Sequence, residues 1–272
     1  MVEILVHFIV PALVGVLIGV ASGLLGIGGG TVMVPIFRLA FGMSATMSTA
    51  TSLFAIIPTS ISGAISHVKG KTCIPALGIA AGLGGACLSP VGVWLAQLSP
   101  DWLVMLAAAL IIGYSAINMF KKAFKLRPAG QPAAGAYAAA SSDDSPLSRK
   151  QLLQGAAIGL VAGLASGYVG VGGGFIMVPL MLSIIGIPMR KASGTSLIAV
   201  MILAIPGVIE QAIIGNINYL AGIAVVVGSI PGAVLGARLV TKVPERALRI
   251  LFGCFLIVAA VMLALNEFGI FG

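Results

Sequence analysis

Two glycine-rich stretches decide the fold of this chain: Gly26-Ile27-Gly28-Gly29-Gly30-Thr31 and Gly170-Val171-Gly172-Gly173-Gly174-Phe175. Each interrupts a long apolar run, and the second follows the first at an offset of 144 residues. Three consecutive glycines strongly disfavour a continuous helix. The sequence therefore predicts two copies of one structural unit, each containing a helix that is broken at its glycines.

The composition around these stretches is that of a membrane protein. Of the 272 residues, 59% are hydrophobic and 8% are charged, and the mean hydropathy is +1.16. A soluble domain carries about 25% charged residues. These values exclude a soluble enzyme, a disordered protein and a nucleic-acid-binding domain. The three scattered cysteines form no Cys/His cluster, so we expect no metal site and no cofactor.

The offset of 144 residues continues well beyond the glycines. Matching residues keep this spacing without a gap, which composition alone does not explain. The matched pairs include Gly19 with Gly163, Ser22 with Ser166, Pro35 with Pro179, Thr51-Ser52 with Thr195-Ser196, Gly78 with Gly222 and Pro100 with Pro244.

We predict an all-α, polytopic transmembrane helical bundle of eight to ten membrane segments, with a first repeat at residues 1–120, a polar linker at 121–150 and a second repeat at 151–272. Each repeat holds five apolar segments. The second of each is short, and its twelve residues rise only about 18 Å against a hydrocarbon core of about 30 Å. The short segments are therefore expected either to cross partly or to re-enter. The segments lie at about 4–25, 31–42, 46–67, 74–97 and 102–120, then 151–169, 175–186, 192–214, 217–240 and 247–266.

Basic residues predict the orientation of the segments. Cytoplasmic turns carry an excess of Lys and Arg, and placing the basic turns there accounts for all but Arg38 of the 15 basic residues. Lys69 and Lys71 lie in a basic turn, whereas their equivalents 144 residues later lie in a neutral one. Equivalent turns therefore fall on opposite faces. We predict inverted repeats, with both termini outside and the central loop in the cytoplasm.

The glycine motifs are the predicted binding site. A helix broken at membrane depth must line a cavity or be buried in protein, and the helix that follows the break presents unpaired amides and the positive end of its dipole. Because glycine lets a ligand approach closely, the motifs favour an anion site. Close helix packing is the alternative, and it is our interpretation of Gly15, Gly19, Gly23, Gly159, Gly163 and Gly167. The predicted site residues are Gly28, Gly29, Gly30, Thr31, Gly172, Gly173 and Gly174.

Repeated hydroxyls add uncharged donors to this site. Thr51, Ser52, Thr195 and Ser196 can donate to an oxyanion, or they can bond the preceding helical turn and do nothing else. Ser22 and Ser166 form a similar but weaker pair.

Four other polar residues within the segments are candidates for gating or proton coupling: Arg38, His67, Glu210 and Gln211. Each lies near a predicted interface, where snorkelling or simple hydration is the alternative.

Two copies of Gly-xxx-Gly-xx-Gly-x-Gly-Gly-Gly-xxxx-Pro, each followed by Thr-Ser, resemble the sulfite exporter TauE/SafE family of membrane permeases. The resemblance covers nearly the whole chain apart from the central loop. It implies a multi-pass protein of the bacterial plasma (inner) membrane that moves small sulfur oxyanions or organosulfonates, usually outward. The residues alone indicate only a small anion.

The leading hypothesis is thus a secondary transporter, an exporter of small sulfur-containing anions such as sulfite or organosulfonates, which works by alternating access. The alternatives are an anion channel of the same architecture and a transporter of another small organic anion. A membrane-embedded enzyme is disfavoured, because no carboxylate pair or nucleophile–base pair lies within the segments. The expected partners are the anion and membrane lipid, not nucleic acid, and a homo-oligomer is left open.

Overall fold

The computed structural model describes residues 10–125 and 148–267, which fold as helices joined by short turns. The first repeat contains α2 (Val10–Leu25), α3 (Gly30–Phe41), α4 (Ala45–Lys69), α5 (Pro75–Leu98) and α6 (Asp101–Lys125). The second contains α7 (Arg149–Val169), α8 (Gly174–Leu180), the π-helix η2 (Met181–Ile185), α9 (Met189–Ile214), α10 (Tyr219–Leu239) and α11 (Glu245–Glu267). The predicted all-α fold is confirmed.

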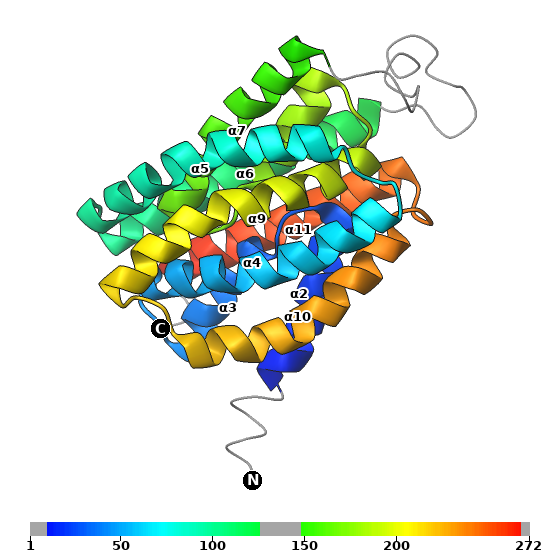
Figure 1. Cartoon of the computed structure of the whole chain (residues 1–272). Coiled ribbons are helices and arrows are strands. Elements are labelled where there is room, and N and C mark those ends of the chain that lie inside the picture. The colour runs from blue at the N-terminus through cyan, green and yellow to red at the C-terminus, as the bar shows by residue number, and fades with distance from the viewer. Residues whose placement is uncertain (1–9, 126–147, 268–272) are drawn as a thin grey trace.

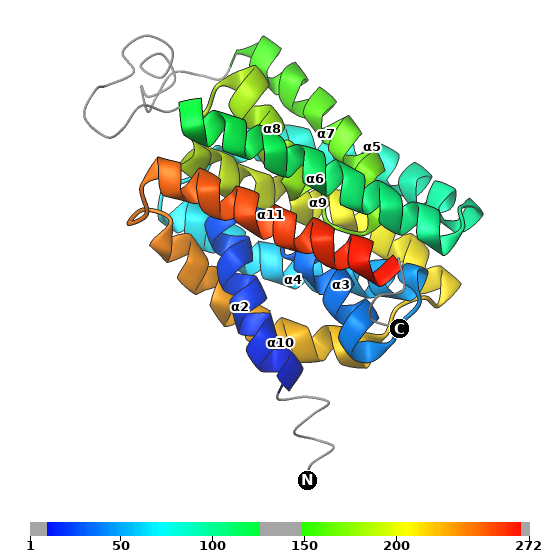
Figure 2. The same cartoon turned by 180° about the vertical axis from the view of Figure 1, so that it is seen from behind.

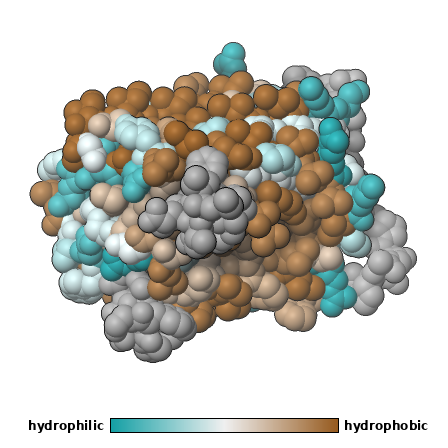
Figure 3. Space-filling model, turned by 90° about the horizontal axis from the view of Figure 1, so that it is seen from below, coloured by the Kyte–Doolittle hydropathy of each residue, from teal (hydrophilic) through white to brown (hydrophobic). Residues whose placement is uncertain are grey.

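Seven of these helices are long and apolar enough to cross a membrane, and three shorter apolar helices accompany them. Their apolar outer faces form a brown belt between two ends at which hydrophilic residues gather (Figure 3). Residues 121–125 and 149–150 of the predicted linker are helical, while residues 126–147 lie outside the described part of the chain.

The helix boundaries follow the repeat closely. Helices α3, α4, α5 and α6 begin 144 residues before α8, α9, α10 and α11, respectively. The π-helix breaks this correspondence, because α3 continues as an α-helix where its equivalent changes to η2 after Leu180. The sequence analysis missed this change of helix type.

The two repeats are interleaved rather than side by side. Helix α2 packs in parallel against α10, with Gly15 against Val225 and Gly23 against Ala233, and α7 packs in the same way against α5. At these glycines a Cβ would collide with the backbone of the partner helix. The interpretation of these glycines as packing residues is confirmed.

Equivalent helices of the two repeats run in opposite directions. In the pair α4 and α9, Gly63 lies against Leu197 and Gly207 lies against Leu53, so the helices are antiparallel. Helices α6 and α11 also run antiparallel along the back of the molecule (Figure 2). The pseudo-two-fold axis is therefore perpendicular to the helices, and the repeats are inverted.

The turns between the helices gather at the two ends of the bundle (Figure 1), and these ends differ in charge. The basic end holds the turns at 70–74, 186–188 and 240–244, which contact one another: Arg190 donates to the carbonyl of Val243, and Ile74 donates to Thr195. The neutral end holds the turns at 42–44, 99–100 and 215–218, which are joined by bonds from Ala45 to Asp101 and from Asn218 to Thr51. Assignment of the basic end to the cytoplasm remains a prediction.

Candidate functional site

The two glycine breaks meet inside the bundle. A Cβ placed on Gly30 would lie 2.5 Å from the carbonyl oxygen of Val171, and one on Gly174 would collide with the backbone of Gly26 and Ile27. Residues 26–31 and 170–175 are all buried. Inversion of the repeats thus brings the starts of α3 and α8 together from opposite sides.

The breaks lie at the middle of the bundle. A Cβ on Gly28 would lie 2.9 Å from Val200 and 3.3 Å from Ile56, and one on Gly172 would contact the same two side chains. Ile56 and Val200 are equivalent residues near the midpoints of α4 and α9. Helix α2 therefore enters the bundle and ends at the break, and α3 returns to the neutral end, where Arg38 pairs with Asp101.

Glycine conformation forms the turn before each half-helix. The N-cap residues Gly29 and Gly173 have φ angles of 85° and 66°, in the left-handed region that other residues rarely adopt. The Gly29 carbonyl accepts from Val32 and Met33 at 3.2 and 3.1 Å. Gly30 and Thr31 precede Val32 in α3, and within the described residues no backbone carbonyl accepts a hydrogen bond from their amides.

The second break is similar but not identical. The Gly173 carbonyl accepts from Ile176 and Met177 at 3.1 and 3.0 Å. The amide of Gly174 donates to the carbonyl of Gly172 at 2.8 Å, which leaves Phe175 as the first amide without a described backbone acceptor. Of the first two amides of each half-helix, three therefore have no described backbone acceptor: those of Gly30, Thr31 and Phe175.

Buried hydroxyls without hydrogen-bond partners in the described structure lie beside the glycines of the two breaks. The β-carbons of Ser22 and Ser166 lie 3.7 and 3.4 Å from the Cβ positions of Gly29 and Gly173, and the hydroxyl oxygen of Ser60 lies 3.4 Å from that of Gly28. The hydroxyl of Thr31, at the start of α3, is also buried and unpartnered. Ser22 and Ser166 are equivalent residues of the two repeats, so the arrangement is nearly symmetric.

Of the two predicted hydroxyl pairs, the threonines have structural partners. Thr51 accepts from the amide of Asn218 at 3.0 Å, and Thr195 accepts from the amide of Ile74 at 2.9 Å. These bonds satisfy amides at the starts of α10 and α5, near opposite ends of the bundle.

The serines of these pairs lie nearer the breaks. Ser196 donates to the carbonyl of Gly26 at 2.7 Å and also lies 2.8 Å from the carbonyl of Ser193. Its equivalent Ser52 is buried and has no partner in the described structure. Ser52 and Ser196 therefore differ in their hydrogen bonding, although they occupy equivalent positions in the sequence repeat.

Of the four candidates for gating or proton coupling, Arg38, Glu210 and Gln211 lie near the neutral end, whereas His67 contacts the last turn of α2, just before the first break. His67 Nε2 donates to the carbonyl of Gly23 at 2.7 Å, and Nδ1 lies 2.7 Å from the Thr72 hydroxyl near the basic end. Gln211 accepts from Asn216 at 2.9 Å near the neutral end, close to Glu210. Arg38 lies 4.0 Å from Asp101.

The side chains beside the breaks offer hydrogen-bond donors but no charge. Ser22, Ser60, Ser166 and Thr31 are fully buried, as are Ile27 and Val171. Such a site can replace the hydration of a small oxyanion with amides and hydroxyls. The sequence analysis ranked Ser22 and Ser166 low and missed Ser60, which aligns with Ala204 and so gives no repeat signal.

Comparison with known proteins agrees with this architecture. The family model described as "Sulfite exporter TauE/SafE" matches residues 11–263. The chain is 29% identical over 268 residues to the "Probable membrane transporter protein YunE" of Bacillus subtilis (strain 168), covering 92% of this chain and 97% of that protein.

Two further relatives also carry transporter names. The "Probable membrane transporter protein YdhB" of the same strain is 29% identical over 238 residues, covering 87% of this chain and 92% of its own length. A "Probable membrane transporter protein" of Haemophilus influenzae is 29% identical over 274 residues, with 93% and 97% covered. This chain therefore belongs to the sulfite exporter TauE/SafE family of membrane proteins.

Proposed function

We propose that this protein is a secondary transporter that exports small sulfur-containing anions by alternating access. One observation carries the proposal: the starts of two inverted half-helices meet at the buried centre of the bundle, beside hydroxyls that have no partner in the described structure. Buried hydroxyl groups without partners are costly. A ligand that accepts hydrogen bonds would remove that cost when it occupies the site.

The geometry favours an oxyanion as that ligand. The amides of Gly30, Thr31 and Phe175 and the hydroxyls of Ser22 and Ser166 are donors from both repeats. The N-terminus of each helix also acts on an anion like a positive charge of about half an elementary charge. A sulfite or sulfonate group, with its three oxygens, can accept several of these donors at once.

Burial at the centre supports alternating access. Ile27 and Val171 are inaccessible to solvent, as are Ile56 and Val200, so the breaks are closed from both ends. Because the repeats are inverted, a rocking movement that opens one end has an equivalent movement that opens the other. Prolines inside α3, α4, α8 and α9 are positions at which helices can bend: Pro35, Pro58, Pro179 and Pro206.

The membrane potential can supply energy for export. Moving one negative charge out of a cell with a negative interior is favourable by about 2.3 kcal/mol per 100 mV. The sulfur chemistry of the substrate is carried over from the family, and the outward direction agrees with this electrical driving force.

The test is anion binding and flux by serine variants. We expect sulfite or a short alkanesulfonate to stabilise the purified protein against heat, and the Ser22→Ala/Ser166→Ala double variant to bind it at least tenfold more weakly. A matched control is Thr241→Val, which removes an exposed hydroxyl in the turn between α10 and α11, at the basic end and away from the breaks.

Flux in proteoliposomes separates the remaining possibilities. A transporter should show saturable uptake that responds to an imposed potential and falls in the double variant. Unchanged binding and flux in that variant would refute the site. Non-saturable flux far above transporter turnover would identify a channel instead, and saturable flux only of carboxylates would identify a carrier of other organic anions.

A further inference from the structure

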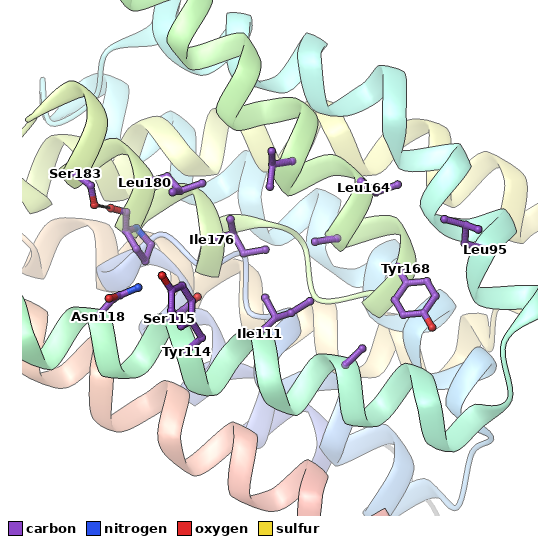
Figure 4. Close-up of a pocket in the computed structure, with 14 residues that line it drawn as sticks. Leu95, Ile111, Tyr114, Ser115, Asn118, Leu164, Tyr168, Ile176, Leu180 and Ser183 are labelled. Carbon is purple, nitrogen blue, oxygen red and sulfur yellow. Dashed lines mark hydrogen bonds between the residues drawn. The ribbon is translucent and has the colours of Figure 1, made fainter.

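A large cavity lies between α6, α7 and the segment α8–η2, beside the second glycine break, whose residues 170–174 do not line it (Figure 4). Its volume is about 780 Å³, and most of the side chains that line it are apolar. Helix α8 contributes Ile176 and Pro179 to one wall. Tyr114 and Val161 at its rim are 69% and 56% exposed, so the cavity opens on the apolar belt of the protein rather than at either end.

The cavity is elongated along the helices. On α6 it is lined by Ala107, Ile111, Ser115 and Asn118, which recur every three or four residues on one helix face. From Ala107 to Asn118 the helix rises about 16 Å, close to half of a hydrocarbon core of about 30 Å. The cavity therefore has the length of one lipid leaflet.

One end of the cavity is polar. The side chains of Ser115 and Asn118 face it beside Ser183 (Figure 4). Among the residues that line the cavity, the one hydrogen bond drawn joins Ser183 to the carbonyl of Pro179, and none involves the Ser115 hydroxyl or the Asn118 amide (Figure 4). Polar groups at membrane depth without partners are costly, so this end is suited to a ligand that accepts hydrogen bonds.

The repeat shows that the fold does not require these polar residues. The equivalents of Ser115 and Asn118 on α11 are Ala259 and Met262, and the equivalent of Ser183 is Leu39. The same helical framework is therefore built with apolar residues in the other half. The polar end is a special property of the cavity on α6.

Positive charge lies just beyond the polar end. Lys121 follows Asn118 by one turn of α6 and is exposed, and Arg149 and Lys150 are exposed at the start of α7. All three belong to the basic end of the bundle. From the apolar groove through the polar end to the basic residues, these features match a ligand that carries an apolar chain, then hydrogen-bond acceptors, then a negative head group.

We propose that this cavity binds an anionic membrane phospholipid. One acyl chain lies in the apolar groove between α6 and α7, the ester carbonyls accept from Ser115 and Asn118, and the phosphate head group lies beside Lys121. The bound chain contacts Ile176 and Pro179 of the half-helix α8. This inference concerns a site separate from the glycine breaks and does not depend on the identity of the transported anion.

The experiment measures thermal unfolding of the full-length protein in detergent with added lipid. Phosphatidylglycerol and phosphatidylcholine with the same acyl chains are compared on the wild type and on Ser115→Ala/Asn118→Met, which installs the residues of the other repeat. We expect phosphatidylglycerol to raise Tm more than phosphatidylcholine does, and the double variant to lose at least half of that difference. Ile117→Met, on the exposed face of α6, is the control and should keep it.

A second measurement keeps the proposal testable if the double variant folds poorly. Phosphatidylglycerol with a photoreactive group on its acyl chain should label peptides that contain residues 107–118 and 161–168 in the wild type. Ala165→Phe, which fills the groove, should reduce this labelling at least threefold. Equal stabilisation by the two lipids, or labelling spread evenly over the apolar belt and unaffected by Ala165→Phe, would overturn the proposal.

Discussion

The hydroxyl of Ser196 donates a 2.7 Å hydrogen bond to the carbonyl of Gly26, which lies 170 residues earlier in the chain. This bond joins α9 of the second repeat to the glycine break of the first. It stabilises the freed carbonyl at the end of α2, where a helical partner is missing.

Ser196→Ala should therefore destabilise the protein. Leaving a buried carbonyl without a partner costs about 1–3 kcal/mol, which we expect as a lower Tm in detergent. Ser52→Ala is the matched control, because Ser52 is the equivalent residue and its hydroxyl has no partner in the described structure. A Tm for Ser196→Ala equal to that of Ser52→Ala would show that the bond to Gly26 contributes nothing.

Gly30→Ala should impair anion transport. The added methyl group would lie 2.5 Å from the Val171 carbonyl and from the Ile56 side chain, so the two breaks would be pushed apart. We expect at least a tenfold loss of flux in proteoliposomes. Gly113→Ala provides the comparison, since it also replaces a helical glycine but meets no atom within 4 Å. Equal flux in the two variants would contradict a close contact between the breaks.

The two carboxylates that cap α4 and α9 should differ in their contribution to stability. Asp101 accepts from Ala45, and Glu245 accepts from Met189, both at 3.2 Å and at equivalent positions. Glu245 also pairs closely with Arg249, and these two side chains are 32% and 4% exposed. Asp101 lies 4.0 Å from Arg38, and these two side chains are 46% and 19% exposed.

Removing a carboxylate from a buried cation costs about 3–5 kcal/mol, and a surface pair contributes about 0–1 kcal/mol. Glu245→Ala should thus lower Tm clearly more than Asp101→Ala. Adding Arg249→Met to Glu245→Ala should restore part of the loss. Equal shifts in Tm for the two single variants would argue against a strong buried pair.

Cys73 offers a test of orientation. It lies in the turn between α4 and α5, where burial raises the pKa of its thiol to about 11. Because only the thiolate reacts with maleimides, labelling at pH 7 should be slow and should rise about tenfold per pH unit toward pH 10.

In a Cys87→Ala/Cys254→Ala background, a membrane-impermeant maleimide should label Cys73 in inside-out vesicles and not in intact cells, when both are held at pH 9. Labelling in intact cells alone would place the basic end outside and reverse the predicted orientation.

The class of protein and the plan of its fold could be predicted from the sequence. Hydropathy required membrane helices, because 8% charged residues do not cover a water-facing surface. The constant spacing of glycines, prolines and Thr-Ser pairs defined the repeat, and basic turns on opposite faces predicted its inversion. These features are local or periodic, so they can be recognised along one chain.

Which polar groups remain available at the centre could not be predicted from the sequence, because it depends on how the helices pack. Thr51 and Thr195 recur in the repeat as clearly as any residue, yet both bond amides at the starts of distant helices. Ser60 has no counterpart in the repeat, yet its buried hydroxyl lies beside Gly28. Whether a hydroxyl has a partner depends on residues distant in the sequence, 167 residues away for Thr51 and 121 for Thr195, and the sequence repeat gives no sign of those contacts.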